Sequence, residues 1–131
     1  MVLMTKSAEK IDAKQIYSSL RTYGPTAKGL LTPDEAVHRQ RLVAAALLAR
    51  YCENSWNGGN VLDIGCGYGS MIPLLQEITT NHRYTGVDMT DWILEVARDR
   101  YGAQGKLQLL NKSMDQLDVD DRADLVLMLG I

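Results

Sequence analysis

Hydrophobic and polar positions alternate along this chain in blocks that predict strands and helices in turn. Four short apolar runs predict strands: 61–64, 84–87, 107–110 and 125–129. Two amphipathic segments between them predict helices, 70–78 and 91–101, and a short turn or helix is expected at 113–117. Strands that alternate with helical crossovers favour a parallel sheet, so we expect an α/β fold.

The chain before the first strand predicts two helices. One covers 8–20 and the other, rich in apolar positions, ends near Tyr51. The second helix has a start signal, with Thr32 as N-cap, Pro33 in the first position and Glu35 completing a capping box. We therefore expect an N-terminal helical cap at 1–53 and a core with strands one to four at 54–131, within a single folding unit.

Composition narrows the class of protein. The 131 residues suit one domain, and a net charge of −2 with interspersed acids and bases argues against nucleic-acid binding. No apolar run approaches the ~18–20 residues of a membrane span, and the polar N-terminus does not resemble a signal peptide. Cys52 and Cys66 lack metal-binding spacing and are interpreted as free thiols. We expect a cytoplasmic protein with no metal, nucleic-acid or membrane partner.

Glycines at alternate positions follow the first predicted strand, at Gly65, Gly67 and Gly69. Glycine tolerates positive φ and has no Cβ, so a ligand can lie against the backbone of such a loop. The loop has no Lys for a phosphate-binding P-loop. Ser70 stands where the dinucleotide fingerprint has its third glycine, which makes a dehydrogenase a distant alternative.

Two acids indicate the kind of ligand. Asp63 precedes the first glycine by two residues, where it would repel a pyrophosphate but suits a cationic group. Asp88 ends the second predicted strand, where a carboxylate can accept both hydroxyls of a ribose. Together these features describe an adenosine with a positively charged, phosphate-free tail.

The segments 61–70 and 84–90 resemble the first two motifs of class I S-adenosylmethionine-dependent methyltransferases. Residues 23–27 and 32–36 are similar to the N-terminal segment of small bacterial members, and 124–131 to the family's fourth strand. The resemblance implies a Rossmann-like parallel sheet with flanking helices. It also implies transfer of a methyl group from S-adenosylmethionine to a small-molecule acceptor, with S-adenosylhomocysteine as product.

The resemblance also implies roles for individual residues. The backbone of the loop containing Gly65, Cys66, Gly67 and Gly69 would approach the methionine portion, and Asp63 would face its ammonium group. Asp88 would bind the ribose. The other implied cofactor contacts are Met89 and Met114 beside the adenine, Ser113 or Asp115 at its amino group, and Tyr23 and Tyr17 closing over the site. No catalytic residue is assigned, and neither His38 nor His82 is a candidate.

The family's pattern continues beyond its fourth strand with a helix and three more strands, so the C-terminal half is expected to be incomplete here. Three alternatives stay open: a fragment of a longer enzyme, a homodimer that pairs through the fourth strand, or completion by a separate partner chain. The functional alternative to an enzyme is a non-catalytic subunit that binds S-adenosylmethionine or a partner.

Overall fold

The computed structural model describes residues 20–24, 34–56, 59–78, 83–102, 106–118 and 123–129. Its described strands form one parallel sheet in the order β3-β2-β1-β4. Their bounds are β1 (Asn60–Ile64), β2 (Arg83–Asp88), β3 (Leu107–Asn111) and β4 (Leu125–Leu127). The structure confirms the expected α/β class and places the fourth strand beside the first.

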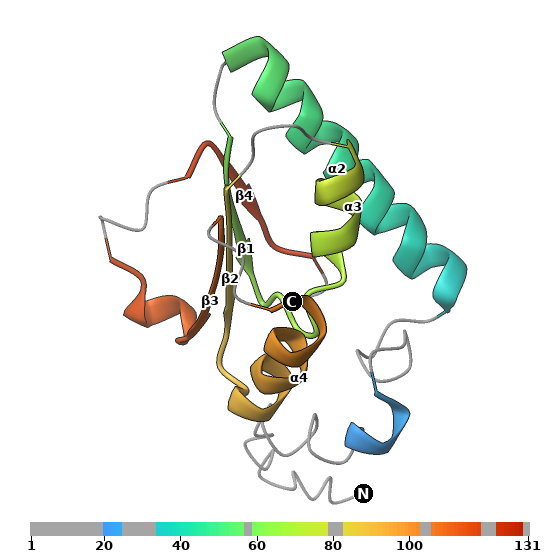
Figure 1. Ribbon diagram of the computed structural model, residues 1–131, viewed down its shortest axis with the longest axis vertical. Helices are drawn as coiled ribbons and strands as arrows, with labels where there is room; N and C mark the ends of the chain where they lie inside the picture. The colour runs from blue at the N-terminus through green and yellow to red at the C-terminus, as the bar shows by residue number, and fades with distance from the viewer. Residues whose placement is uncertain are drawn as a thin grey trace, which may run out of the picture.

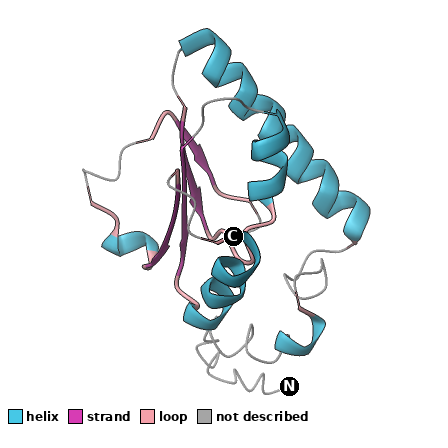
Figure 2. Cartoon of the chain, in the orientation of Figure 1, coloured by secondary structure: helices cyan, strands magenta, loops and turns pink. Residues whose placement is uncertain are grey.

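Three α-helices lie together on one face of the sheet (Figure 1). They are α2 (Glu35–Trp56), α3 (Met71–Ile78) and α4 (Asp91–Tyr101). The short 3-10 helix η3 (Met114–Gln116) lies on the opposite face, and η1 (Arg21–Tyr23) lies at the N-terminal end of the described chain (Figure 2). None of the described helices combines the length and the hydropathy that a membrane crossing requires.

Helix α2 extends further than expected at its C-terminal end. It begins at Glu35, and its cap is Asp34, whose Oδ1 accepts a hydrogen bond from the Val37 amide at 2.8 Å. An Asp in this position satisfies a free amide of the first turn. The predicted N-cap, Thr32, lies outside the described residues. The helix also continues past Tyr51 to Trp56, because the chain offers no glycine or proline before that point. The expected boundary between residues 53 and 54 therefore falls inside α2. The expected helix at 8–20 lies outside the described residues, except for Leu20.

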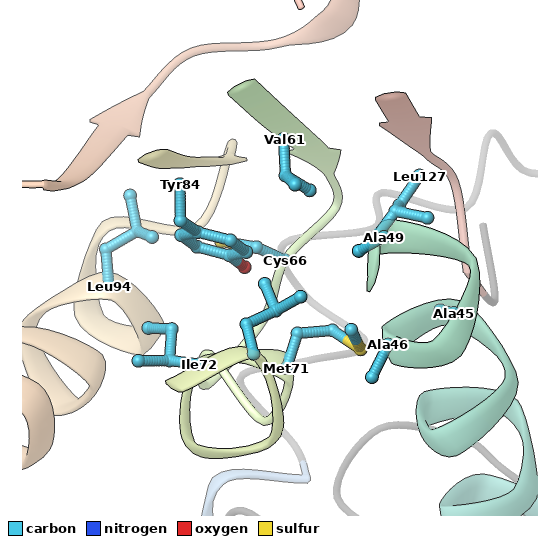
Figure 3. Packing of buried hydrophobic residues seen from close by; sticks show 11 residues of the cluster. Ala45, Ala46, Ala49, Val61, Cys66, Met71, Ile72, Tyr84, Leu94 and Leu127 are labelled. Carbon is cyan, nitrogen blue, oxygen red and sulfur yellow. The ribbon is translucent and has the colours of Figure 1, made fainter. Parts of the chain in front are cut away.

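The larger core cluster lies between the sheet and the three helices (Figure 3). Small side chains on α2, Ala45, Ala46 and Ala49, let that helix approach the sheet closely. A smaller cluster lies on the other face, where Leu62, Ile64 and Val87 are covered by side chains from β3 and the β3–β4 connection. The sheet is therefore covered unequally, with most of the core on the helical face.

Strand β4 pairs with β1 and forms one edge of the described sheet. Its paired residues run from Leu125 to Leu127, two fewer than expected, and pair with Val61 to Asp63 of β1. Two apolar side chains on and after this strand are half exposed, Val126 at 51% and Met128 at 50%. Among the described residues, β4 therefore presents apolar side chains that are only half covered.

Candidate functional site

The glycine loop crosses from the end of β1 over the end of β2. The amides of Gly65 and Cys66 both donate to the Val87 carbonyl, at 2.7 and 3.1 Å. The three loop glycines have φ of 73°, 56° and 74°, values that other residues adopt only with strain. At Gly69 an added Cβ would also stand 2.7 Å from Ile72 Cδ1. The loop is thus held in a shape that only glycine adopts without strain at three of its positions, and the side chains of Cys66 and Tyr68 between them are buried.

Asp88 joins this loop to the start of α4. Its Oδ2 accepts from the Gly67 amide at 3.0 Å, and its Oδ1 accepts from the Thr90 amide at 2.9 Å. A carboxylate offers about four lone-pair sites, so both oxygens can accept further hydrogen bonds from a ligand. Asp88 is therefore at once a loop anchor and a candidate ligand for a pair of hydroxyls.

Asp63 is buried beneath the loop, with only 4% of its surface exposed. Its Oδ2 accepts a hydrogen bond from the Tyr84 hydroxyl at 2.6 Å. Burial is the main cause that raises the pKa of Asp63 to about 6, the Tyr84 hydrogen bond lowers that pKa, and the charge of Asp88 raises it. Asp63 is therefore an acid that changes protonation close to neutral pH.

Cys66 lies in the same buried region. Burial first, and then the negative charges of Asp63 and Asp88, raise the pKa of its thiol well above the usual value. Because the thiolate is the reactive form, this thiol is a poor nucleophile. Cys66 is a loop residue whose buried side chain packs in the larger core cluster.

Two of the predicted adenine contacts, Ser113 and Asp115, are hydrogen-bonded to each other. Ser113 and Gln116 form a capping box on η3, in which the Gln116 side chain accepts from the Ser113 amide at 2.8 Å. The Ser113 hydroxyl also donates to Asp115. The side chains of Met89 and Met114 are exposed by 40% and 50%. The structure therefore joins the two predicted polar candidates, Ser113 and Asp115, in one hydrogen bond.

Asn111 is a candidate that the sequence analysis did not identify. It pairs with Asp88 in the β2–β3 register, and its Nδ2 donates to the Asp88 carbonyl at 3.1 Å. The sequence signal for Asn111 is a polar side chain at the carboxyl end of a strand. It lies next to Asp88, the residue proposed to bind the ribose.

The described N-terminal residues contact α4. The Arg21 guanidinium lies over the Trp92 ring, 5.0 Å from its centroid, and the Tyr68 ring meets Trp92 edge-on at 6.1 Å. Neither Arg21 nor Trp92 was a predicted site residue. Tyr23 of η1 is 42% exposed, and Tyr17 lies outside the described residues.

Two hydroxyls near this contact are buried without a hydrogen-bond partner among the described residues, those of Tyr68 and Thr90. The described part of the chain contains no cluster of His, Cys, Asp or Glu that could hold a metal ion. His38 lies on α2, away from the glycine loop in sequence, and His82 lies outside the described residues.

Comparison with known proteins identifies the family to which this chain belongs. The model of a methyltransferase domain matches residues 61–131, more than half of the chain. The malonyl-[acyl-carrier protein] O-methyltransferase of Acetivibrio thermocellus is 27% identical over 88 residues, which are 67% of this chain and 31% of that protein.

Solved structures show the same fold. Magnesium protoporphyrin IX methyltransferase from Synechocystis PCC 6803, with bound S-adenosylmethionine, is 20% identical with a TM-score of 0.62, covering 92% of this chain and 62% of that one. A plantazolicin methyltransferase in complex with S-adenosylhomocysteine is 17% identical with a TM-score of 0.59, covering 92% and 42%. The chain thus spans only part of the length of these proteins. It belongs to the methyltransferase domain family, of the class I S-adenosylmethionine-dependent type.

Proposed function

We propose that the chain binds S-adenosylmethionine at the carboxyl edge of the sheet and transfers its methyl group to a small-molecule acceptor. The carrying observation is Asp88, whose carboxylate holds the glycine loop against the start of α4. A carboxylate that can accept hydrogen bonds from hydroxyl groups therefore lies beside the glycine loop. Among nucleotide ligands, one without phosphates suits a site in which Asp63 lies directly below the loop.

The residues present fit the parts of this cofactor. Asp88 would accept the two ribose hydroxyls, and the backbone of Gly65, Gly67 and Gly69 would lie against the methionine chain. Asp63 would compensate the ammonium group, directly or through a water molecule. The contacts proposed for the adenine are Met89, Met114, Asn111, Ser113 and Asp115, with Tyr23 closing over the site.

Bound S-adenosylmethionine supplies a methyl group that its sulfonium already activates, and S-adenosylhomocysteine is the product. The protein then has to align the acceptor and exclude water. No described residue is assigned as a general base. The relatives are named for acceptors as different as malonyl-[acyl-carrier protein] and magnesium protoporphyrin IX, so we propose no individual acceptor.

Calorimetric titration with S-adenosylmethionine and, separately, with NAD tests the proposal. We expect S-adenosylmethionine alone to bind, and Asp88→Ala to weaken its binding at least tenfold. Asp91→Ala is the matched control, because Asp91 is an exposed acid in the first turn of α4. A folded wild-type chain that binds no S-adenosylmethionine, or an equal loss in both variants, would contradict the proposal. Circular dichroism checks that each variant is folded.

The second candidate function is a non-catalytic subunit that binds S-adenosylmethionine or a partner. The half-exposed apolar side chains of Val126 and Met128 at the edge of β4 favour it, because such an edge can pair with another chain. Methyl-labelled cofactor incubated with a pool of small metabolites separates the two. Transfer of label supports the enzyme, and tight cofactor binding without transfer supports the subunit.

The proposal includes association through β4 and a location in the cytoplasm. A second copy, or another chain that adds to β4, would cover the open edge, since exposed apolar edges tend to associate. Cys52 and Cys66 are free thiols in the structure, which suits the reducing cytoplasm.

A further inference from the structure

Tyr84 and Asp63 come from neighbouring strands but meet on the same face of the sheet. The register pairs Val61 with Tyr84 and Asp63 with Gly86. Tyr84 therefore lies two residues before the residue that pairs with Asp63. Its hydroxyl nevertheless reaches the Asp63 carboxylate, 2.6 Å away. The ring therefore leans along the strand toward the glycine loop, and Figure 3 shows its hydroxyl oxygen beside Cys66.

Gly86 provides the space for this arrangement. An added Cβ at Gly86 would come within 3.0 Å of Tyr84 Cε1 and 2.8 Å of Cys66 Sγ. Any side chain there would stand where the ring and the thiol pack. Asp63, Cys66 and Tyr84 consequently form one buried group under the loop, which we call the sub-loop cluster.

The sub-loop cluster contains acids and no cation. The titratable groups that act on Asp63 are Tyr84 and Asp88, and Cys66 lies beside them. Apolar side chains from α2, α3 and α4 pack in the adjoining core, and no cation among the described residues is a cause of the Asp63 pKa shift. A buried carboxylate without a positive partner is costly, and an ammonium group is the chemistry that would compensate it.

We propose that Tyr84 is a positioning residue for the amino-acid end of S-adenosylmethionine, whose hydroxyl holds Asp63 ionised and directed to the ligand's ammonium group. This inference rests on the proposed function. It makes the affinity for ammonium-bearing ligands depend on pH through Asp63. The affinity for ligands without an ammonium group does not depend on the protonation of Asp63.

Two ligands isolate the effect. S-adenosylhomocysteine carries the ammonium group, whereas 5′-methylthioadenosine keeps the adenosine and the thioether but lacks the amino-acid end. Titration calorimetry between pH 5.0 and 7.5 avoids the titration of the ligand's own amino and carboxyl groups. For the wild-type chain we expect S-adenosylhomocysteine to bind roughly tenfold more weakly at pH 5 than at pH 7. The affinity for 5′-methylthioadenosine should stay constant.

Tyr84→Phe keeps the ring and removes the hydroxyl. Loss of the hydrogen bond raises the pKa of Asp63 further, so the fall in S-adenosylhomocysteine affinity should begin at higher pH, with a several-fold loss at pH 6.5. Binding of 5′-methylthioadenosine should be unchanged. Tyr51→Phe, at an exposed position of α2, is the control and should match the wild type throughout. An unshifted pH profile, or an equal loss for both ligands at every pH, would overturn the proposal.

Asp63→Asn is a second, independent variant, which keeps an acceptor for Tyr84 but cannot ionise. It should bind S-adenosylhomocysteine weakly and without pH dependence over this range. If Tyr84→Phe does not fold, this variant decides, because a retained pH dependence would refute the role of Asp63. A wild-type chain that binds neither ligand would instead refute the proposed function itself.

Discussion

At the scale of single residues, folding favours the protonated form of Asp63, whereas the proposed binding of an ammonium group favours its carboxylate. Its pKa is raised to about 6, so the folded state takes up a proton more readily than the unfolded chain. Stability from this group is then highest at acid pH and falls as the pH rises toward 6. Above that pH the folded protein keeps a buried negative charge, which stabilises nothing until a cation binds.

Asp63→Asn should therefore stabilise the free protein at pH 8 and not at pH 4. The gain is expected to be roughly 1–3 kcal/mol, because the variant no longer buries a charge. Urea unfolding at the two pH values measures it. A destabilised Asp63→Asn chain at pH 8 would mean that the carboxylate is needed for the fold itself.

Gly86→Ala tests the packing of the sub-loop cluster. The new methyl group would meet Cys66 Sγ and Leu109 Cδ2 at 2.8 Å, so we expect a loss of about 1–3 kcal/mol in the free energy of unfolding. Gly102→Ala is the control. Gly102 has φ of 68° and open space around it, so that change costs only the backbone strain of about 1 kcal/mol. Adding Cys66→Ala to Gly86→Ala should restore part of the loss, and no recovery would contradict the contact.

Residues that follow local rules were predictable, and residues defined across strands were not. The glycine loop and Asp88 follow from spacing alone, and the loop glycines have the positive φ that their spacing suggested. The Tyr84–Asp63 hydrogen bond depends on the register of two strands and on the missing side chain of Gly86, neither of which one sequence displays. The cofactor contacts of the implied residues stay predictions.

At the scale of elements, prediction succeeded where a helix carries its own boundary signals. Helix α4 runs from Asp91 to Tyr101 as expected, because an acid begins its first turn and Gly102 ends it with positive φ. The first turn of α2 has a signal that the sequence analysis did not use, Asp34, whose carboxylate accepts a hydrogen bond from the Val37 amide.

The contact between η1 and α4 gives a prediction at this scale. Arg21 lies on the Trp92 ring at a partly exposed site, so Arg21→Ala should lower the free energy of unfolding by about 0.5–1 kcal/mol. Arg50→Ala, at an exposed position of α2, is the control and should change it little. Urea titration followed by tryptophan fluorescence makes the comparison. Equal effects of the two changes would show that the Arg21 contact contributes no stability.

At the scale of the whole molecule, the uneven cover of the sheet is the main feature. The helical face is closed by α2, α3 and α4, whereas the other face has only η3 and the β3–β4 connection among the described residues (Figure 1). The parallel order of the strands was predictable from the alternation of elements and the family resemblance. The half exposure of Val126 and Met128 was not, because it depends on which described elements pack against β4.

That edge leads to the last prediction. The 131-residue chain alone should associate with itself as its concentration rises, because β4 presents an unpaired edge with Val126 and Met128 half exposed beside it. Val126→Lys should weaken the association, since a lysine at an edge opposes further pairing. Leu48→Lys changes an equally exposed side chain of α2 and should leave it unaltered. Sedimentation equilibrium measures the mass of each variant. A wild-type chain that stays monomeric at high concentration, or equal effects of the two lysines, would exclude self-association through β4.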